Sequence, residues 1–297
     1  MRVLGIGDNV VDRYVNQQKM YPGGNAFNIA VLASMCGAAS GYLGVFGDDD
    51  AALHIYLTAK KLGIDLTHCR FQKGENGYAE VELQKGERIF VGSNNGGISK
   101  ETPLCLTKLD LEYVKTFDLV HTSIFSYIEE ELPALSETGV FVSMDFSDKA
   151  KEGYYKQCIP YLDCACFSCG NMELGKVKTL MKQLMSYKCR KMVLATRGEK
   201  GAVVLDRKGR FYLQSPYLVE ARDTMGAGDA FIACFLSSYL EMMRRAVDSW
   251  KGREREGITI SEELERRVIE ISLYQAALFS AENCRREGTF GYGKKYN

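Results

Sequence analysis

One stretch of the chain constrains its fold more than any other. Residues 223–229 read Asp-Thr-Met-Gly-Ala-Gly-Asp and lead directly into an apolar run at residues 230–236. Glycine fills no core volume, but it permits a tight turn and lets a ligand approach the backbone closely. The apolar run predicts a helix whose first turn contains residues 226–229. Since first-turn amides lack helical acceptors and the helix dipole is positive there, the stretch predicts an anion-binding site.

The carboxylate of Asp229, at the mouth of this predicted site, has two interpretations. An acid at the start of a helix can cap it by accepting backbone N–H groups. It can equally act as a general base beside a phosphate or oxyanion that the glycine amides hold. The stretch alone leaves both interpretations open.

Length and charge limit the class of protein. A chain of 297 residues with 46% hydrophobic content can bury the core of one large α/β domain or two small ones. The 38 basic and 38 acidic residues give zero formal net charge, so nothing favours nucleic acid or an anionic membrane as a partner. No run is long and apolar enough to span a bilayer, and too few apolar residues precede Asp8 for a signal peptide. We therefore expect a cytoplasmic protein.

The cysteines predict core thiols and no metal centre. The ten cysteines lie within apolar stretches, which is typical of a reducing compartment. Their one cluster, Cys164, Cys166 and Cys169, lacks a second pair, and the chain has only three histidines. We therefore assign no protein metal ligands.

Strand and helix patterns alternate along most of the chain. Residues 2–7, 119–123, 139–145 and 163–168 are short apolar runs separated by helical stretches, which predicts a mostly parallel sheet with helices on both faces. Asp8, Asp12 and Asp145 follow such runs, at the edge of the sheet where ligands collect, although turn acids are also common there. Residues 69–95 differ, because their alternating segments 79–83 and 87–91 predict a hairpin.

Four motifs resemble signatures of the PfkB (ribokinase-like) carbohydrate kinases. Residues 223–229 match the family pattern Asp-Thr-x-Gly-Ala-Gly-Asp at every position. Residues 23–28 match Gly-Gly-x-x-x-Asn, and residues 7–12 match Gly-x-x-x-x-Asp. Residues 196–201 resemble the Thr-x-Gly-x-x-Gly nucleotide loop.

The resemblance implies a role for each motif. Asp229 is expected to be the base that deprotonates the acceptor hydroxyl, beside an anion hole made by Gly226, Ala227 and Gly228. The sugar contacts are expected from Asp12, Gly24 and Asn28, and the nucleotide contacts from Asn171, Thr196, Gly198 and Gly201. ATP and Mg²⁺ are the expected cofactors. The family's Asn-x-x-Glu motif falls on Ser168 and Asn171 and is altered, which leaves the handling of magnesium open.

The resemblance also implies a fold and an assembly. We expect a ribokinase-like three-layer α/β fold in a single kinase domain over residues 1–297, with a central mostly parallel sheet and helices on both faces. A small β-sheet lid is expected from residues of about 12–21 and 69–95, and many relatives pair such lids in a homodimer.

The acceptor is less constrained than the reaction. Within the family, residues 6–12, 47–50 and 145–149 resemble members that phosphorylate the 6-hydroxyl of sugar–amine adducts such as fructoselysine. Two alternatives remain at this point: a kinase for fructose, ribose or a nucleoside, and an inactive sugar-binding regulatory protein on the same fold.

Overall fold

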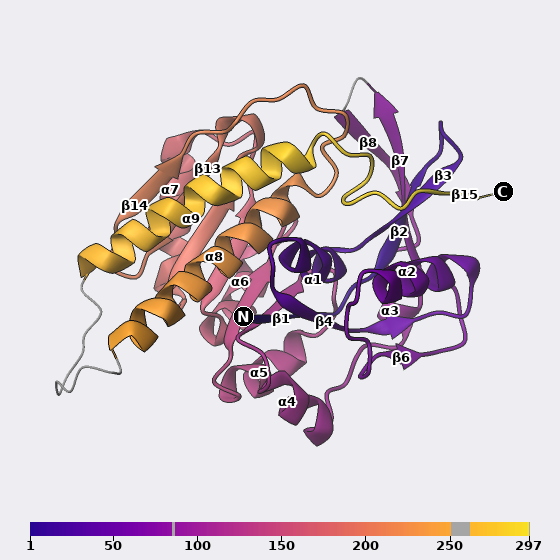
Figure 1. The fold of residues 1–297 in the computed structure, drawn as a ribbon, viewed down its shortest axis with the longest axis horizontal. Coiled ribbons are helices and arrows are strands. Elements are labelled where there is room, and N and C mark those ends of the chain that lie inside the picture. The colour runs from indigo at the N-terminus through magenta and orange to yellow at the C-terminus, as the bar shows by residue number, and fades with distance from the viewer. Residues whose placement is uncertain (85–86, 251–261, 297) are drawn as a thin grey trace.

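An eight-stranded sheet forms the centre of the structure, a computed structural model that describes residues 1–84, 87–250 and 262–296 (Figure 1). The strands from β4 to β12 are parallel, and β13 and β14 continue the sheet antiparallel. In spatial order they are β14 (Phe211–Gln214), β13 (Ala202–Asp206), β12 (Met192–Thr196), β11 (Cys164–Ser168), β10 (Phe141–Asp145), β9 (Leu119–Ser123), β1 (Arg2–Ile6) and β4 (Ala39–Leu43).

Helices cover both faces of this sheet, because its strands are apolar at consecutive positions. In β1, Val3 belongs to the core under α1 (Asn25–Met35), α8 (Ala227–Trp250) and α9 (Glu262–Asn283), whereas Leu4 belongs to the core on the opposite face. Strands that are buried on both sides have this composition. Figure 1 shows α8 and α9 in front of the sheet and α7 behind it. The helices of the second face are α4 (Lys108–Val114), α5 (Leu132–Glu137), α6 (Glu152–Cys158) and α7 (Leu174–Ser186).

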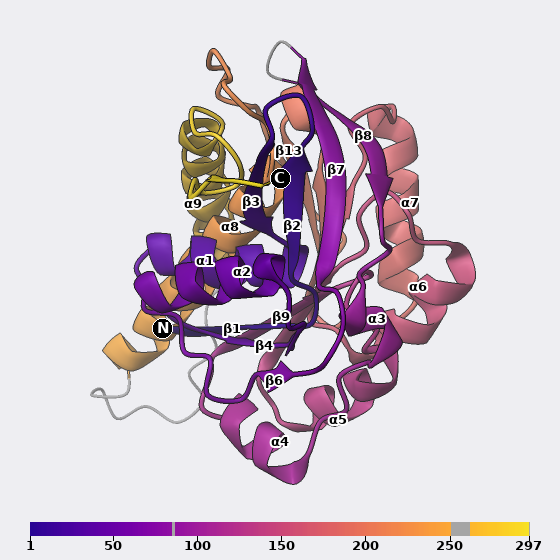
Figure 2. The ribbon, with the colours of Figure 1, turned by 90° about the vertical axis from the view of Figure 1, so that its right-hand side faces the viewer.

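A second, five-stranded sheet lies across the direction of β1 and β4 (Figure 2). Its order is β15 (Lys294–Lys295), β3 (Lys19–Gly23), β2 (Val10–Tyr14), β7 (Gly77–Gln84) and β8 (Glu87–Ser93). The predicted hairpin is β7 and β8, and its turn residues 85–86 lie outside the described residues. The C-terminal strand β15 was not expected from the sequence. The predicted α/β class, with its mostly parallel sheet, its two helical layers and its small sheet, is confirmed.

The two faces of the small sheet have different neighbours. Val11 packs with α1 and with α2 (Asp50–Lys61). Tyr14, Tyr21 and Val81, on the other face, pack against Met225. The small sheet therefore contacts the loop that carries the Gly-Ala-Gly motif.

Three further short elements, apart from single turns of 3₁₀ helix, are described. They are the paired strands β5 (Val45–Phe46) and β6 (Arg70–Phe71) and the helix α3 (Ile98–Glu101). Within the described ranges, no helix has both the length and the apolarity that a membrane span requires.

Candidate active site

Asp229 lies in the first turn of α8, beside the first residues of α1. Its Oδ1 accepts a hydrogen bond from Asn25 Nδ2 at 2.8 Å, and its Oδ2 accepts one from Asn28 Nδ2 at 2.6 Å. The residue is half-buried, so it is not sealed within the core. The fold thus joins the predicted base to the predicted sugar ligand Asn28, although the two are 201 positions apart in the chain.

The start of α1 is fixed by Gly24 and Asp8. Gly24 has a φ of 104°, and a Cβ there would lie 2.7 Å from the Asn9 Cα, so only glycine fits. The buried Asp8 carboxylate accepts the N–H groups of Asn25 and Ala26 and the hydroxyls of Ser123 and Ser126. Asp8 therefore caps α1 and ties it to the strand ends, and it is not a solvated turn acid.

Asp12 lies on the face of β2 that is turned toward the Gly-Ala-Gly loop. Side chains two residues apart in a strand share a face, and Tyr14 on that face packs against Met225. Asp12 is buried, and its carboxylate fills the place where a side chain on Gly23 would lie. The predicted sugar ligands Asp12, Gly24 and Asn28 thus come from neighbouring elements.

The loop before α8 is fixed by the buried Asp223. Its carboxylate accepts hydrogen bonds from the Tyr14 hydroxyl at 2.6 Å and from the N–H groups of Met225 and Gly288. Gly226 precedes the helix with a φ of 68°, and a Cβ there would lie 2.6 Å from Thr289 Oγ1. The helix begins at Ala227, one residue later than the sequence predicted.

The predicted nucleotide loop lies next to the start of α8. Thr196 ends β12, and its Oγ1 is 3.8 Å from the position that a Cβ on Gly228 would take. Gly198 is the first residue of a single turn of 3₁₀ helix and Gly201 directly follows that turn, and both have positive φ angles. The exposed Asn171 follows β11, whose next residue Cys169 donates its N–H to the Thr196 carbonyl. All four predicted nucleotide residues are therefore at one edge of the main sheet.

The structure adds Asn25 and His121, which the sequence did not place in the site, and joins them to Asp145, which the sequence left open between a ligand and a turn acid. Asn25 Nδ2 donates a second hydrogen bond to Asp145 Oδ2 at 2.8 Å, and His121 Nε2 lies 3.0 Å from Asn25 Oδ1. Burial raises the pKa of Asp145 to about 6, and burial lowers the pKa of His121 to about 3. The only sequence signal for Asp145 was its place after a predicted strand, and Asn25 occupies a variable position of its signature.

Comparisons with known proteins identify the family of this chain. A profile described as pfkB family carbohydrate kinase matches residues 2–251. The chain belongs to the PfkB family. The fructosamine kinase FrlD of Bacillus subtilis (strain 168) is 37% identical to it over 297 residues, which cover all of this chain and 95% of the relative. The fructoselysine 6-kinase of Escherichia coli (strain K12) is 33% identical over 234 residues, covering 79% of this chain and 87% of the relative.

Solved structures share the fold of this PfkB protein. A ribokinase from Giardia lamblia superposes with a TM-score of 0.77 at 15% identity, covering 98% of this chain and 95% of that one. A fructokinase from Vibrio cholerae O395 gives a TM-score of 0.70 at 19% identity, covering 98% of this chain and 94% of that one. Together with the family match, the similarity establishes a ribokinase-like, ATP-dependent sugar kinase.

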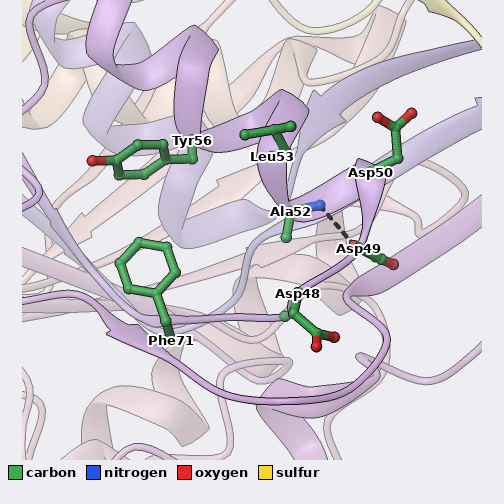
Figure 3. Close-up of a pocket in the computed structure, with 8 residues that line it drawn as sticks. Asp48, Asp49, Asp50, Ala52, Leu53, Tyr56 and Phe71 are labelled. Atoms are coloured by element: carbon green, nitrogen blue, oxygen red, sulfur yellow. Dashed lines mark hydrogen bonds between the residues drawn. The ribbon is translucent and has the colours of Figure 1, made fainter.

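A pocket of about 370 Å³ in this PfkB kinase lies elsewhere, at the start of α2 (Figure 3). The acids that line it already have partners. Asp48 accepts the Gly74 N–H, Asp49 caps α2 through the Ala52 N–H, and Asp50 pairs with Lys294. Asp229 does not line this pocket.

Proposed function

We propose that this kinase transfers the γ-phosphate of ATP to the 6-hydroxyl of a fructosamine, with fructoselysine as the expected acceptor. The names of the fructosamine kinase and of the fructoselysine 6-kinase described above support the class of acceptor. The observation that carries the chemistry is the Asp229 carboxylate, which two asparagine amides hold at the amino end of a 24-residue helix.

Asp229 would act as the base. The acceptor oxygen attacks the γ-phosphorus in line, so that a P–O bond forms to the sugar while the bond to ADP breaks, and the hydroxyl proton passes to Asp229. Gly226, Ala227 and Gly228 would present backbone amides to the transferred phosphoryl group, where the helix dipole favours negative charge. Because no covalent enzyme intermediate is needed, positioning and electrostatics carry the rate enhancement.

Asn28 is well placed to bind the acceptor. It is 5% exposed, and its Oδ1 finds no hydrogen-bond partner among the described residues. A buried acceptor without a donor costs free energy, so a sugar hydroxyl there would be bound favourably. Asp12 and the backbone at Gly24 would supply the remaining sugar contacts.

Thr196, Gly198, Gly201 and Asn171 would hold the nucleotide. Mg²⁺ would arrive with the phosphates of the nucleotide. In the part of the chain that the structure describes, no group of three His, Cys, Asp or Glu side chains could hold a metal ion. Magnesium commonly takes phosphate oxygens and water in place of a protein cage. The oxygens of Asn171 and Glu173 are the nearby candidates for its water shell. A reaction that consumes ATP, in a protein whose ten cysteines are free thiols, fits the cytoplasm.

The acceptor is tested by ADP release with ATP and Mg²⁺. We expect kcat/KM for fructoselysine to exceed that for fructose, ribose and adenosine by about tenfold or more. Fructose is the matched control, because it lacks only the amine substituent. A higher kcat/KM for another compound would show that this compound is the acceptor, and the proposed kinase reaction would stand. Absence of turnover with all of them would overturn the proposal.

The small sheet would serve as a lid within a single kinase domain of residues 1–297. Two chains would form a homodimer by pairing the outer strands of their small sheets. The edge strand β8 exposes Ile89, Phe90 and Val91 by 46%, 62% and 51%. An exposed apolar edge strand is a ready surface for pairing with another chain. Closure over the acceptor would exclude water from phosphoryl transfer.

The dimer is tested by light scattering after size exclusion. We expect twice the chain mass for the wild type and a monomer for the double variant Ile89→Lys/Val91→Lys, because two charges would be buried at the interface. Leu109→Lys is the control, since Leu109 is 76% exposed on α4, away from the small sheet. A wild-type monomer, or a double variant that stays dimeric, would contradict this interface.

A further inference from the structure

Asn25 connects two carboxylates. Its Nδ2 donates to Asp229 Oδ1 and to Asp145 Oδ2, both at 2.8 Å. A side-chain amide has two N–H donors, so this nitrogen is fully used. The opposite orientation of the amide would turn its carbonyl oxygen toward both carboxylates, which would be repulsive. The carboxylates therefore determine which way Asn25 points.

This orientation in turn determines the state of His121. Asn25 Oδ1 can only accept, so His121 Nε2, 3.0 Å away, must carry the proton. The imidazole is fully buried, and because burial lowers its pKa to about 3 it is neutral. Its unprotonated Nδ1 then accepts from the Ser143 hydroxyl at 2.8 Å. Ser143 Oγ also lies 3.2 Å from the Val120 carbonyl, and its single proton serves the shorter contact to Nδ1.

The backbone supports the same arrangement. Asn25 is the first residue of α1, and its N–H donates to Asp8 Oδ2 at 2.5 Å. His121 lies in β9, which pairs with both β1 and β10 in the middle of the sheet. Asn25 is thus held by α1 through its backbone and by β9 through its side chain. A residue that orients a catalytic group must itself be held by rigid elements of this kind.

We propose that Asn25, oriented by neutral His121, is the positioning residue that fixes the rotation of the Asp229 carboxylate. The inference rests on the proposed role of Asp229 as base. Asn25 donates to one oxygen of Asp229 and Asn28 donates to the other, so the plane of the carboxylate is held in one orientation. Misplacement of a catalytic group by as little as 1 Å can cost about a hundredfold in rate.

The kinetic test compares four variants. Asn25→Ala should lower kcat by about tenfold to a hundredfold and leave KM for ATP near the wild-type value. His121→Leu should have a similar effect, whereas His121→Gln, which offers an N–H again, should recover most of the rate. Gln183→Ala is the control, because this exposed amide on α7 donates to the Tyr187 hydroxyl, and α7 covers the opposite face of the main sheet from α8. Wild-type kcat in Asn25→Ala, or equal losses in the two His121 variants, would overturn the inference.

A second measurement does not depend on activity. Nitrogen NMR of the three histidines should show one imidazole, His121, that stays neutral and Nε2-protonated between about pH 5 and 8. Its signals should shift in Asn25→Ala. A wild-type enzyme without turnover would refute the proposed function alone, whereas an Nδ1-protonated or titrating His121 would refute the positioning inference alone.

Discussion

Replacing Asp229 by Asn is expected to lower kcat by about a hundredfold or more, while KM for the acceptor stays near its wild-type value. General base catalysis contributes roughly 10²–10⁴-fold to turnover, and an amide cannot accept the hydroxyl proton. The acceptor would still be bound by Asp12, Gly24 and Asn28, because a sugar hydroxyl can pair with either the carbonyl or the NH₂ group of the Asn28 amide. A loss confined to kcat is the signature of an interaction made only in the transition state.

The variant should fold, because one neighbour can adapt to it. In the wild type, Asn25 and Asn28 each donate an N–H to one oxygen of the Asp229 carboxylate. The amide of the variant would present an NH₂ group to one of these two donors, so that two donors would face each other. Asn25 cannot turn over, since His121 and Asp145 hold it. Asn28 can, because its Oδ1 lacks a partner among the described residues. We therefore expect a small change in Tm, which thermal unfolding would measure beside the kinetics.

The control for this change is Asp118→Asn. Asp118 is an exposed carboxylate that accepts the Arg2 N–H just before β9, at the opposite end of the strands from Asp229. It should leave kcat unchanged. If Asp229→Asn also kept the wild-type kcat with a folded protein, Asp229 would be a helix cap and the base would have to be sought elsewhere.

The layers of this fold were predictable because each depends on short-range patterns. Runs such as 140–142 and 164–167 are apolar at successive positions, as is typical of strands buried on both faces. The Gly-Ala-Gly stretch predicted a turn at a helix start, and the structure differs by a single residue. The strand β15 was missed, since two lysines near the C-terminus carry no strand signal of their own and pair only because β3 is adjacent.

The sequence predicted site residues only at positions that belong to a family signature. Asp229 and Asn28 were identified by their signatures, and the structure brings them into contact. The partnership of Asn25, His121 and Asp145 depends on three segments that meet only in the folded chain. The protonation states of His121 and Asp145 and the orientation of the Asn25 amide depend on burial and on each other, which no spacing in the sequence encodes. The sequence left Asp8 open between a ligand and a turn acid for the same reason, because the amides that it caps belong to another element.

Replacing Gly226 by Ala is expected to destabilise the protein and to abolish most of its activity. The positive φ of Gly226 costs an alanine about 1–2 kcal/mol. Overlap of the new methyl group with the Thr289 side chain adds about 1–3 kcal/mol of overpacking. Any relief must move the loop that positions the first-turn amides of α8. Loss of one oxyanion donor costs about 10²–10³ in kcat, so we expect at least a hundredfold drop.

Gly209→Ala separates backbone strain from steric overlap. Gly209 has a φ of 80°, but a Cβ there would meet no atom within 4 Å. In denaturant unfolding, the free energy of unfolding of Gly209→Ala should therefore fall only by the cost of the strained backbone. The variant should keep full activity. Adding Thr289→Ala to Gly226→Ala should restore part of the stability, because the nearest atoms are the Thr289 Cγ2 and Oγ1. Equal losses in the two glycine variants would show that conformation alone, and not contact with Thr289, requires glycine at position 226.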